Sequence, residues 1–224
     1  LLKCGADVNA VGGVLKEVPL QWAARNEGYG FTHLVALLLE NGADVRHKSI
    51  LGQDALFLAV MAGNANVVFM LLSIGEADVN TMDGRGLTPL LWMCRKRKLA
   101  GQGNAELIRL LLSFGADPTL ADAPPNLPSG VVQHDDGGDG SYGNNCMHYI
   151  AETGKSYVDD YLLQEIVRKS GPGLLTALNS LGNTPKRVAE LNRSDRIHVF
   201  LRHWDYYNAL PKSFVIWSLS LIHI

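Results

Sequence analysis

Apolar residues gather in short segments along this chain, and polar residues separate one segment from the next at a nearly constant spacing. The segments richest in leucine and other apolar residues cover 34–39, 67–72, 107–112 and 161–167. A glycine (Gly42, Gly75 or Gly115) follows each of the first three, and glycine readily adopts the left-handed conformation that ends many helices. We therefore predict a helix over each segment, and in the first three cases the glycine ends it.

A second kind of helix is predicted to begin ahead of each leucine-rich segment. Its clearest copy is the opening Thr88-Pro89-Leu90-Leu91-Trp92-Met93. A threonine hydroxyl can accept a hydrogen bond from an unpaired N–H at a helix start, and proline is tolerated at the first helical position. Leu90 and Met93 lie three residues apart, so we expect them on one buried face. Comparable openings start at Val18, Asp54, Asn145 and Thr184.

One phrase recurs with small changes at the end of each unit. It reads LLKCGADVN, LLENGADVR, LLSIGEADVN and LLSFGADPT at residues 1–9, 38–46, 71–80 and 111–119. The glycines of these phrases, beginning with Gly5, lie 37, 33 and 40 residues apart. Self-similarity at this period indicates a solenoid of helical repeats, in which each unit is stabilised mainly by its neighbours. Binding along a surface is therefore a better expectation than chemistry in a pocket.

The Thr-Pro-Leu-His-x-Ala type of opening, together with the Gly-Ala-Asp ending, resembles the ankyrin repeat. This resemblance implies an all-α ankyrin-repeat solenoid over residues 1–204, with about five to six repeats if partial terminal ones are included. The chain begins at Leu1 within a repeat, without an initiator methionine or signal peptide, so we expect it to be part of a longer protein.

Charge and cysteine content narrow the function further. The 224 residues include 20 basic and 22 acidic ones, and this balance argues against a nucleic-acid-binding surface. Cys4, Cys94 and Cys146 are far apart and form no CxxC pair, so we predict neither a zinc site nor a disulfide framework. The basic run 95–98 is more typical of a solvated face than of a site for an anionic partner.

Proline, glycine and aspartate dominate residues 121–145, and apolar periodicity disappears there. We predict a disordered hairpin insertion over this segment. His134 and the aspartates that follow it do not fit the ligand spacing of a calcium loop. Gly154-Lys155-Ser156 lacks the upstream glycine and strand of a phosphate-binding loop, so nucleotide binding is not predicted.

The residue x of each opening is predicted to point into the concave groove of the solenoid. The chain places large apolar residues there: Trp22, Leu58, Trp92, Tyr149 and Val188. Aromatic side chains are efficient interface anchors, so we predict that Trp22, Leu58, Trp92 and Tyr149 bind an extended peptide. The alternative interpretation is that these side chains pack against neighbouring helices and fill the space between repeats.

The C-terminal end of the chain differs in composition from the repeats. Residues 213–224 carry no acidic or basic residue apart from His223, and aromatic residues and Lys212 precede them. A membrane-spanning helix needs about 20 apolar residues. We therefore predict that 205–224 is a linker followed by the start of a truncated transmembrane helix, so that the segment after residue 212 contacts a membrane. A helix that caps the last repeat is the alternative.

Two blocks carry a closer family resemblance. Gly12-Gly13 followed by Val18-Pro19-Leu20-Gln21-Trp22, and the block Asp83–Trp92, resemble the ankyrin segment of the DHHC palmitoyltransferases of the huntingtin-interacting type. The resemblance implies transfer of a palmitoyl group from palmitoyl-CoA to substrate cysteines, with zinc bound in a cysteine-rich domain whose motif does not occur here. No catalytic residue, metal site or cofactor site is therefore expected in this chain.

The same resemblance also implies the role of the repeats. In this family the ankyrin groove recruits protein substrates through short extended peptides, and a tryptophan that matches Trp22 contributes. The expected location is the cytoplasmic face of an intracellular membrane, such as the Golgi or another endomembrane. The alternative function is a soluble ankyrin scaffold with no attached enzyme.

Overall fold

The computed structural model describes residues 5–26, 28–95, 103–124, 142–154 and 158–209. These residues form helices joined by hairpin-shaped loops, and no strand is assigned among them. Five helix pairs follow one another along the chain: α1 (Pro19–Arg25) with α2 (Tyr29–Glu40), α3 (Ala55–Ala62) with α4 (Ala65–Ser73), α5 (Pro89–Arg95) with α6 (Gly103–Ser113), α7 (Cys146–Thr153) with α8 (Asp160–Ser170), and α10 (Pro185–Leu191) with α11 (Asp195–Ala209). A short helix α9 (Gly173–Thr176) precedes the last pair.

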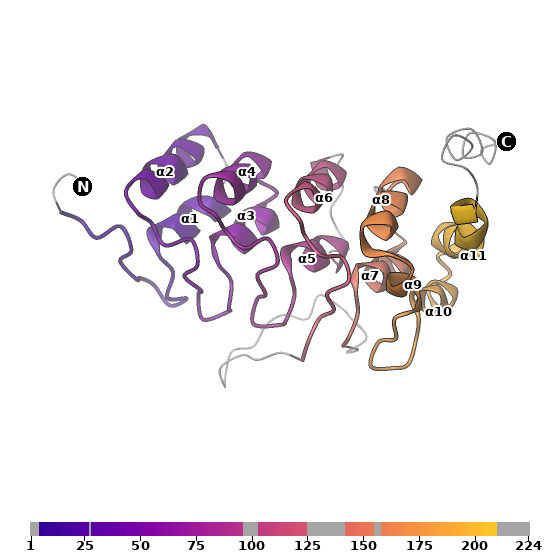
Figure 1. Cartoon of the computed structure of the whole chain (residues 1–224). Helices are drawn as coiled ribbons and strands as arrows, with labels where there is room; N and C mark the ends of the chain where they lie inside the picture. The colour runs from indigo at the N-terminus through magenta and orange to yellow at the C-terminus, as the bar shows by residue number, and fades with distance from the viewer. Residues whose placement is uncertain (1–4, 27, 96–102, 125–141, 155–157, 210–224) are drawn as a thin grey trace.

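The pairs stack side by side into two layers (Figure 1). One layer holds α1, α3, α5, α7 and α10, which we call the inner helices, and the other holds their partners, the outer helices. The hairpin loops project from the inner layer, and the first and last pairs lie at opposite ends of the stack. The all-α solenoid predicted from the sequence is therefore confirmed.

The inner helices begin as their openings predict. The side chain of Asp54 accepts a hydrogen bond from the Phe57 N–H at 2.9 Å, and Thr88 accepts one from the Leu91 N–H at 3.2 Å. Such bonds satisfy backbone donors that the first helical turn leaves unpaired. Because these signals are local, they identify the helix starts without knowledge of the fold.

The glycines that end the outer helices behave as predicted in two of three repeats. Gly42 and Gly115 have φ of 80° and 88°, in the left-handed region. The prediction is wrong for Gly75, because the second repeat carries one extra residue and Glu76 takes the left-handed conformation with φ of 52°. Gly75 is needed instead for space, since a Cβ there would lie 2.8 Å from the carbonyl oxygen of Leu71.

Neighbouring hairpins are linked by backbone hydrogen bonds. The N–H groups of Ile50, Gly84 and Ser180 each donate to a carbonyl of the preceding hairpin, namely those of Leu15, Leu51 and Tyr142 at 3.0, 2.8 and 2.7 Å. The hairpins come so close that a Cβ on Gly52 would lie 2.4 Å from the Gly84 nitrogen. The loops are therefore an ordered third element of the stack.

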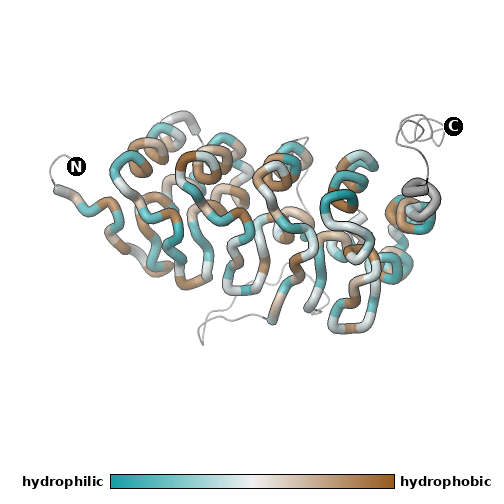
Figure 2. The backbone as a smooth tube through the Cα atoms, in the orientation of Figure 1, coloured by the Kyte–Doolittle hydropathy of each residue, from teal (hydrophilic) through white to brown (hydrophobic). Residues whose placement is uncertain are grey.

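Apolar side chains fill the space between the two layers. Along the backbone, hydrophobic residues recur in the helices of both layers (Figure 2). Alanines and leucines of the inner helices meet leucines and valines of the outer ones, and a single cluster of buried residues runs from Val18 to Trp204. Because each repeat contributes only a thin slice of this cluster, it depends on adjacent repeats for burial. Stability therefore varies along the stack with the number of neighbours a repeat has.

The two ends of the predicted insertion pair with each other. Residues 121–124 and 142–145 are joined by backbone hydrogen bonds, from the Asp122 N–H to the Asn144 carbonyl at 3.1 Å and from the Gly143 N–H to the Asp122 carbonyl at 3.0 Å. These ends belong to the fourth hairpin and are ordered by it, so the prediction of disorder is wrong for them. The centre of the predicted insertion, residues 125–141, lies outside the described residues.

The predicted boundary after residue 204 falls inside a helix, because α11 continues to Ala209. The remaining part of the predicted membrane segment, residues 210–224, lies outside the described residues. Among the helices that the structure describes, none combines the length and the apolar composition that a membrane span requires.

Candidate partner-binding surface

The four residues predicted to line a peptide groove have very different environments. Trp22 is 54% exposed, whereas Leu58, Trp92 and Tyr149 are 5%, 6% and 3% exposed. The prediction of a continuous solvent-facing row is therefore wrong for three of its four members. The alternative interpretation, in which these side chains fill the space between repeats, describes them correctly.

The buried members contact the preceding repeat. The Trp92 ring meets Phe57 of α3 edge-on, with ring centroids 6.4 Å apart and planes inclined by 69°. The guanidinium of Arg95 on α5 lies 5.8 Å from the centroid of the Tyr149 ring on α7. Position x therefore faces the inner helix before it, because inner helices pack directly against one another.

Tyr149 also forms a hydrogen bond with the fourth hairpin. Its hydroxyl donates a hydrogen bond to Oδ2 of Asp122 at 2.7 Å. Burial raises the pKa of the Asp122 carboxyl above its usual value, although this hydrogen bond acts in the opposite direction. Burial, together with the nearby carboxylate, raises the pKa of the Tyr149 hydroxyl well above its usual range. Tyr149 thus fastens the hairpin to α7 and is not available as a groove anchor.

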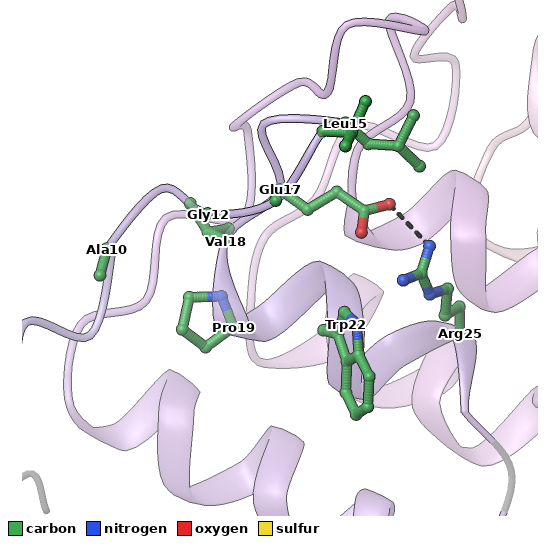
Figure 3. Close-up of a pocket in the computed structure, with 10 residues that line it drawn as sticks. Ala10, Gly12, Leu15, Glu17, Val18, Pro19, Trp22 and Arg25 are labelled. Carbon is green, nitrogen blue, oxygen red and sulfur yellow. Dashed lines mark hydrogen bonds and ion pairs between the residues drawn. The ribbon is translucent and has the colours of Figure 1, made fainter.

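Trp22 differs because no helix of the described residues precedes α1. Its ring borders a hollow of about 390 Å³ between the first hairpin and α1, which we call the Trp22 hollow. Residues of the first hairpin and of α1 line it: Ala10, Gly12, Gly13, Val14, Leu15, Glu17, Val18, Pro19, Trp22 and Arg25. Figure 3 shows Trp22 and Pro19 on α1 beneath the hairpin.

A charged pair forms one side of the Trp22 hollow (Figure 3). Arg25 Nη1 donates to Glu17 Oε1 at 2.9 Å, and the Arg25 guanidinium lies 5.9 Å from the Trp22 ring centroid. The Glu17 side chain is almost buried, whereas that of Arg25 is about one-third exposed. The pair therefore holds the guanidinium beside the ring, where the ring quadrupole attracts it. Sequence reasoning missed Glu17 and Arg25, whose spacing of eight residues gives no sign of the contact.

The hairpin wall of the hollow is fixed by two backbone hydrogen bonds. Gly12 N–H donates to the Glu17 carbonyl at 2.8 Å, and Glu17 N–H donates to the Gly12 carbonyl at 3.0 Å. Gly13 has φ of 69°, a conformation that favours glycine. The Trp22 hollow is thus an apolar, partly aromatic surface with a charged edge.

The cysteine side chains of the described residues lie inside the stack. Cys94 and Cys146 are fully buried, and burial raises the pKa of the Cys146 thiol, which suppresses the reactive thiolate. Among these residues there is no group of three or more histidine, cysteine and acidic side chains placed to hold a metal ion. Cys4 lies outside the described residues.

A family profile and several known proteins are similar to this chain. The family profile described as "Ankyrin repeats (3 copies)" matches residues 1–83 and 20–122, which together make up just over half of the chain. Palmitoyltransferase AKR1 of Lachancea kluyveri is 34% identical over 125 residues, covering 54% of this chain and 16% of that protein. AKR1 of Kluyveromyces lactis is 33% identical over the same length.

A ubiquitin ligase, which is a different class of protein from AKR1, aligns over more of the chain. The E3 ubiquitin-protein ligase XBAT33 of Arabidopsis thaliana is 33% identical over 178 residues, which cover 79% of this chain and 28% of that protein. The chain thus spans less than a third of the length of each of these two relatives. Ankyrin repeats generally mediate binding between proteins, and AKR1 supports the resemblance to the ankyrin portion of palmitoyltransferases. The recurring helix pairs, the hairpins and the profile match together show that the chain belongs to the ankyrin-repeat family.

Proposed function

We propose that this chain is the ankyrin, substrate-recruiting part of a membrane-bound protein-cysteine S-palmitoyltransferase. The observation that supports it most is the half-exposed Trp22 ring beside a preformed hollow, in an array that resembles AKR1 palmitoyltransferases. In the whole protein, a separate domain uses palmitoyl-CoA and zinc to acylate substrate cysteines at the cytoplasmic face of an endomembrane such as the Golgi. The repeats bring the substrate protein to that domain.

The peptide contact proposed here is smaller than a groove along four repeats. An extended segment lays an apolar side chain, such as a proline ring, on Trp22. Tryptophan offers a large rigid surface at little cost in side-chain entropy, which makes it an effective anchor. Arg25 is already held by Glu17, so its exposed edge can contact a peptide carbonyl without first becoming ordered.

A second function is favoured by one observation. XBAT33 aligns over 79% of this chain, against 54% for AKR1 of Lachancea kluyveri. An ankyrin scaffold that is joined to no acyltransferase explains a similarity spread over the whole array equally well. A palmitoylation assay on the complete natural protein separates the two functions, because only the first requires acyl transfer from labelled palmitoyl-CoA to a bound substrate.

The peptide contact is tested by titration calorimetry with the tightest binder from an array of extended, proline-containing peptides. We expect Trp22→Ala to weaken binding by about 1–3 kcal/mol, the range for interface anchors. Phe69→Ala is the matched control, because Phe69 is an aromatic side chain of similar exposure on the outer helix α4. Equal affinity of the parent chain and Trp22→Ala would remove the Trp22 hollow as the peptide site.

A further inference from the structure

Two of the three cysteines of the chain meet at one junction of the stack. Cys94 lies near the end of α5 and Cys146 begins α7, and both side chains are fully buried where these inner helices pack together. We propose that Cys94 and Cys146 are a site of reversible oxidation, at which a disulfide links the third helix pair to the fourth. The proposal concerns the array itself and does not rest on the proposed function.

The two thiols are close enough to interact directly. The Cys146 thiol donates to the Pro118 carbonyl at 3.4 Å, and the Cys94 thiol interacts with Cys146 from the facing helix. Because the Cys146 hydrogen is directed at Pro118, its sulfur remains as an acceptor for the Cys94 thiol. The sulfurs therefore face each other across the junction, from where an S–S bond of about 2 Å can close.

The other junctions show that packing does not require a pair of thiols here. Cys94 is the sixth residue of its inner helix, and Cys146 is the first residue of the next one. Small or apolar residues, also buried, hold these two positions at the other three junctions: Ala24 with Ala55, Val60 with Pro89, and Ala151 with Pro185. Alanine, valine and proline fill the space, whereas two cysteines can also form a bond.

The two cysteines lie at the junction with the longest connection between the described helix pairs. Residues 114–145 join α6 to α7, whereas residues 41–54 join α2 to α3 and residues 74–88 join α4 to α5. A longer connection holds its ends together less firmly, because closing it costs more chain entropy. A covalent link between α5 and α7 limits their separation and is therefore expected to stabilise this junction.

The oxidant in this proposal is a small disulfide, such as oxidised glutathione. One cysteine thiolate attacks the glutathione disulfide, forms a mixed disulfide and releases one glutathione. The second thiolate then attacks the protein sulfur of the mixed disulfide, forms the Cys94–Cys146 bond and releases the other glutathione. Two protein thiols are oxidised, one glutathione disulfide is reduced, and both thiol protons end on the two glutathiones.

Burial makes the reaction depend on opening of the junction. Burial raises the pKa of the Cys146 thiol, and the neighbouring Cys94 thiol adds to the rise. Since a protonated thiol is not a nucleophile and neither side chain is exposed, exchange requires local separation of α5 from α7. Once the bond has formed, the same burial protects it from reduction until the junction opens again.

The test equilibrates the chain with glutathione buffers of defined redox potential and then traps the free thiols by alkylation. Every sample carries Cys4→Ser, because Cys4 is the third thiol of the chain. Urea below the unfolding transition opens the junction often enough for exchange to reach equilibrium. We expect peptide mapping to find a Cys94–Cys146 bond within one chain. This bond should be at least about tenfold more favoured in the folded chain than in the chain fully unfolded by urea.

The equilibrium constant for unfolding should fall by the same factor on oxidation, and urea titrations with and without dithiothreitol measure it. Cys94→Ala and Cys146→Ala are the control variants, because Ala24 and Ala55 hold the matching positions at the first junction. Both variants should fold and show no change on oxidation. A Cys94–Cys146 bond that is no more favoured in the folded chain than in the unfolded one would overturn the proposal. Disulfides found only between two chains, or thiols that stay free at every potential, would overturn it as well.

Discussion

Trp22 and Trp92 occupy the same position of two ankyrin repeats, yet one is half exposed and the other is sealed in the core. Both lie in the first turn after a proline on an inner helix. What differs is the neighbour: Trp92 packs edge-on against Phe57 of the preceding helix, whereas no described helix precedes α1. In a solenoid, the exposure of a side chain is decided by the adjacent repeat as much as by its own.

The comparison changes how aromatic residues at position x should be interpreted. Aromatic side chains contribute large buried areas both in cores and in interfaces, so residue type alone does not distinguish the two roles. At Trp92 and Tyr149 the role is structural, because each ring joins its own repeat to the one before it. At Trp22 the same kind of side chain is half exposed, so it is available to a bound peptide.

The largest expected effect is on stability. Trp92→Ala should destabilise the fold by about 3–5 kcal/mol, since it opens a cavity between two repeats. Trp22→Ala should cost about 1 kcal/mol or less, because half of the ring is already in water. Urea unfolding followed by circular dichroism measures both variants. Similar losses of unfolding free energy in the two variants would contradict this prediction. They would show that the first repeat is as tightly packed as the third.

A smaller difference is expected between two glycines of the hairpins. Gly52 and Gly13 have similar left-handed φ of 72° and 69°, so alanine brings roughly 1–2 kcal/mol of backbone strain at either site. At Gly52 the added Cβ also meets the backbone of Gly84 at 2.4 Å, whereas at Gly13 no atom lies within 4 Å. We expect Gly52→Ala to be more destabilising by about 1–3 kcal/mol, the range for overpacking.

The same unfolding experiment decides this prediction, with Gly13→Ala as the matched control. The difference in unfolding free energy between Gly52→Ala and Gly13→Ala measures the contact between neighbouring hairpins, because the backbone strain is common to both sites. Equal midpoints for the two variants would mean that the hairpins separate without cost and that they do not contribute to the stack.

Features that depend on nearby residues could be predicted from the sequence. The cap at Thr88 and the left-handed Gly42 and Gly115 follow from rules that act within a few residues, and the structure confirms them. The extra residue in the phrase LLSIGEADVN moved the left-handed conformation from Gly75 to Glu76. Sequence reasoning missed this shift because it assumed that all copies of the phrase turn at the glycine.

Features that depend on the neighbouring repeat could not be predicted in this way. The burial of Trp92 follows from Phe57, which lies 35 residues earlier in the chain, and Tyr149 is fixed by Asp122 from within the predicted insertion. The pattern of one opening contains neither contact. Of the candidate site, sequence reasoning therefore identified Trp22 correctly as an exposed ring, but it extended the same environment to three residues that have a repeat in front of them.

The central claim is that Trp22 is open to solvent while Trp92 is enclosed between repeats. Acrylamide quenching of tryptophan fluorescence tests it directly, by comparing the parent chain with Trp22→Phe and with Trp92→Phe. We predict that Trp22→Phe removes an easily quenched, red-shifted component and that Trp92→Phe removes a quench-resistant, blue-shifted one. If loss of Trp22 leaves the quenching unchanged, or if Trp92 proves to be the accessible ring, the account is contradicted.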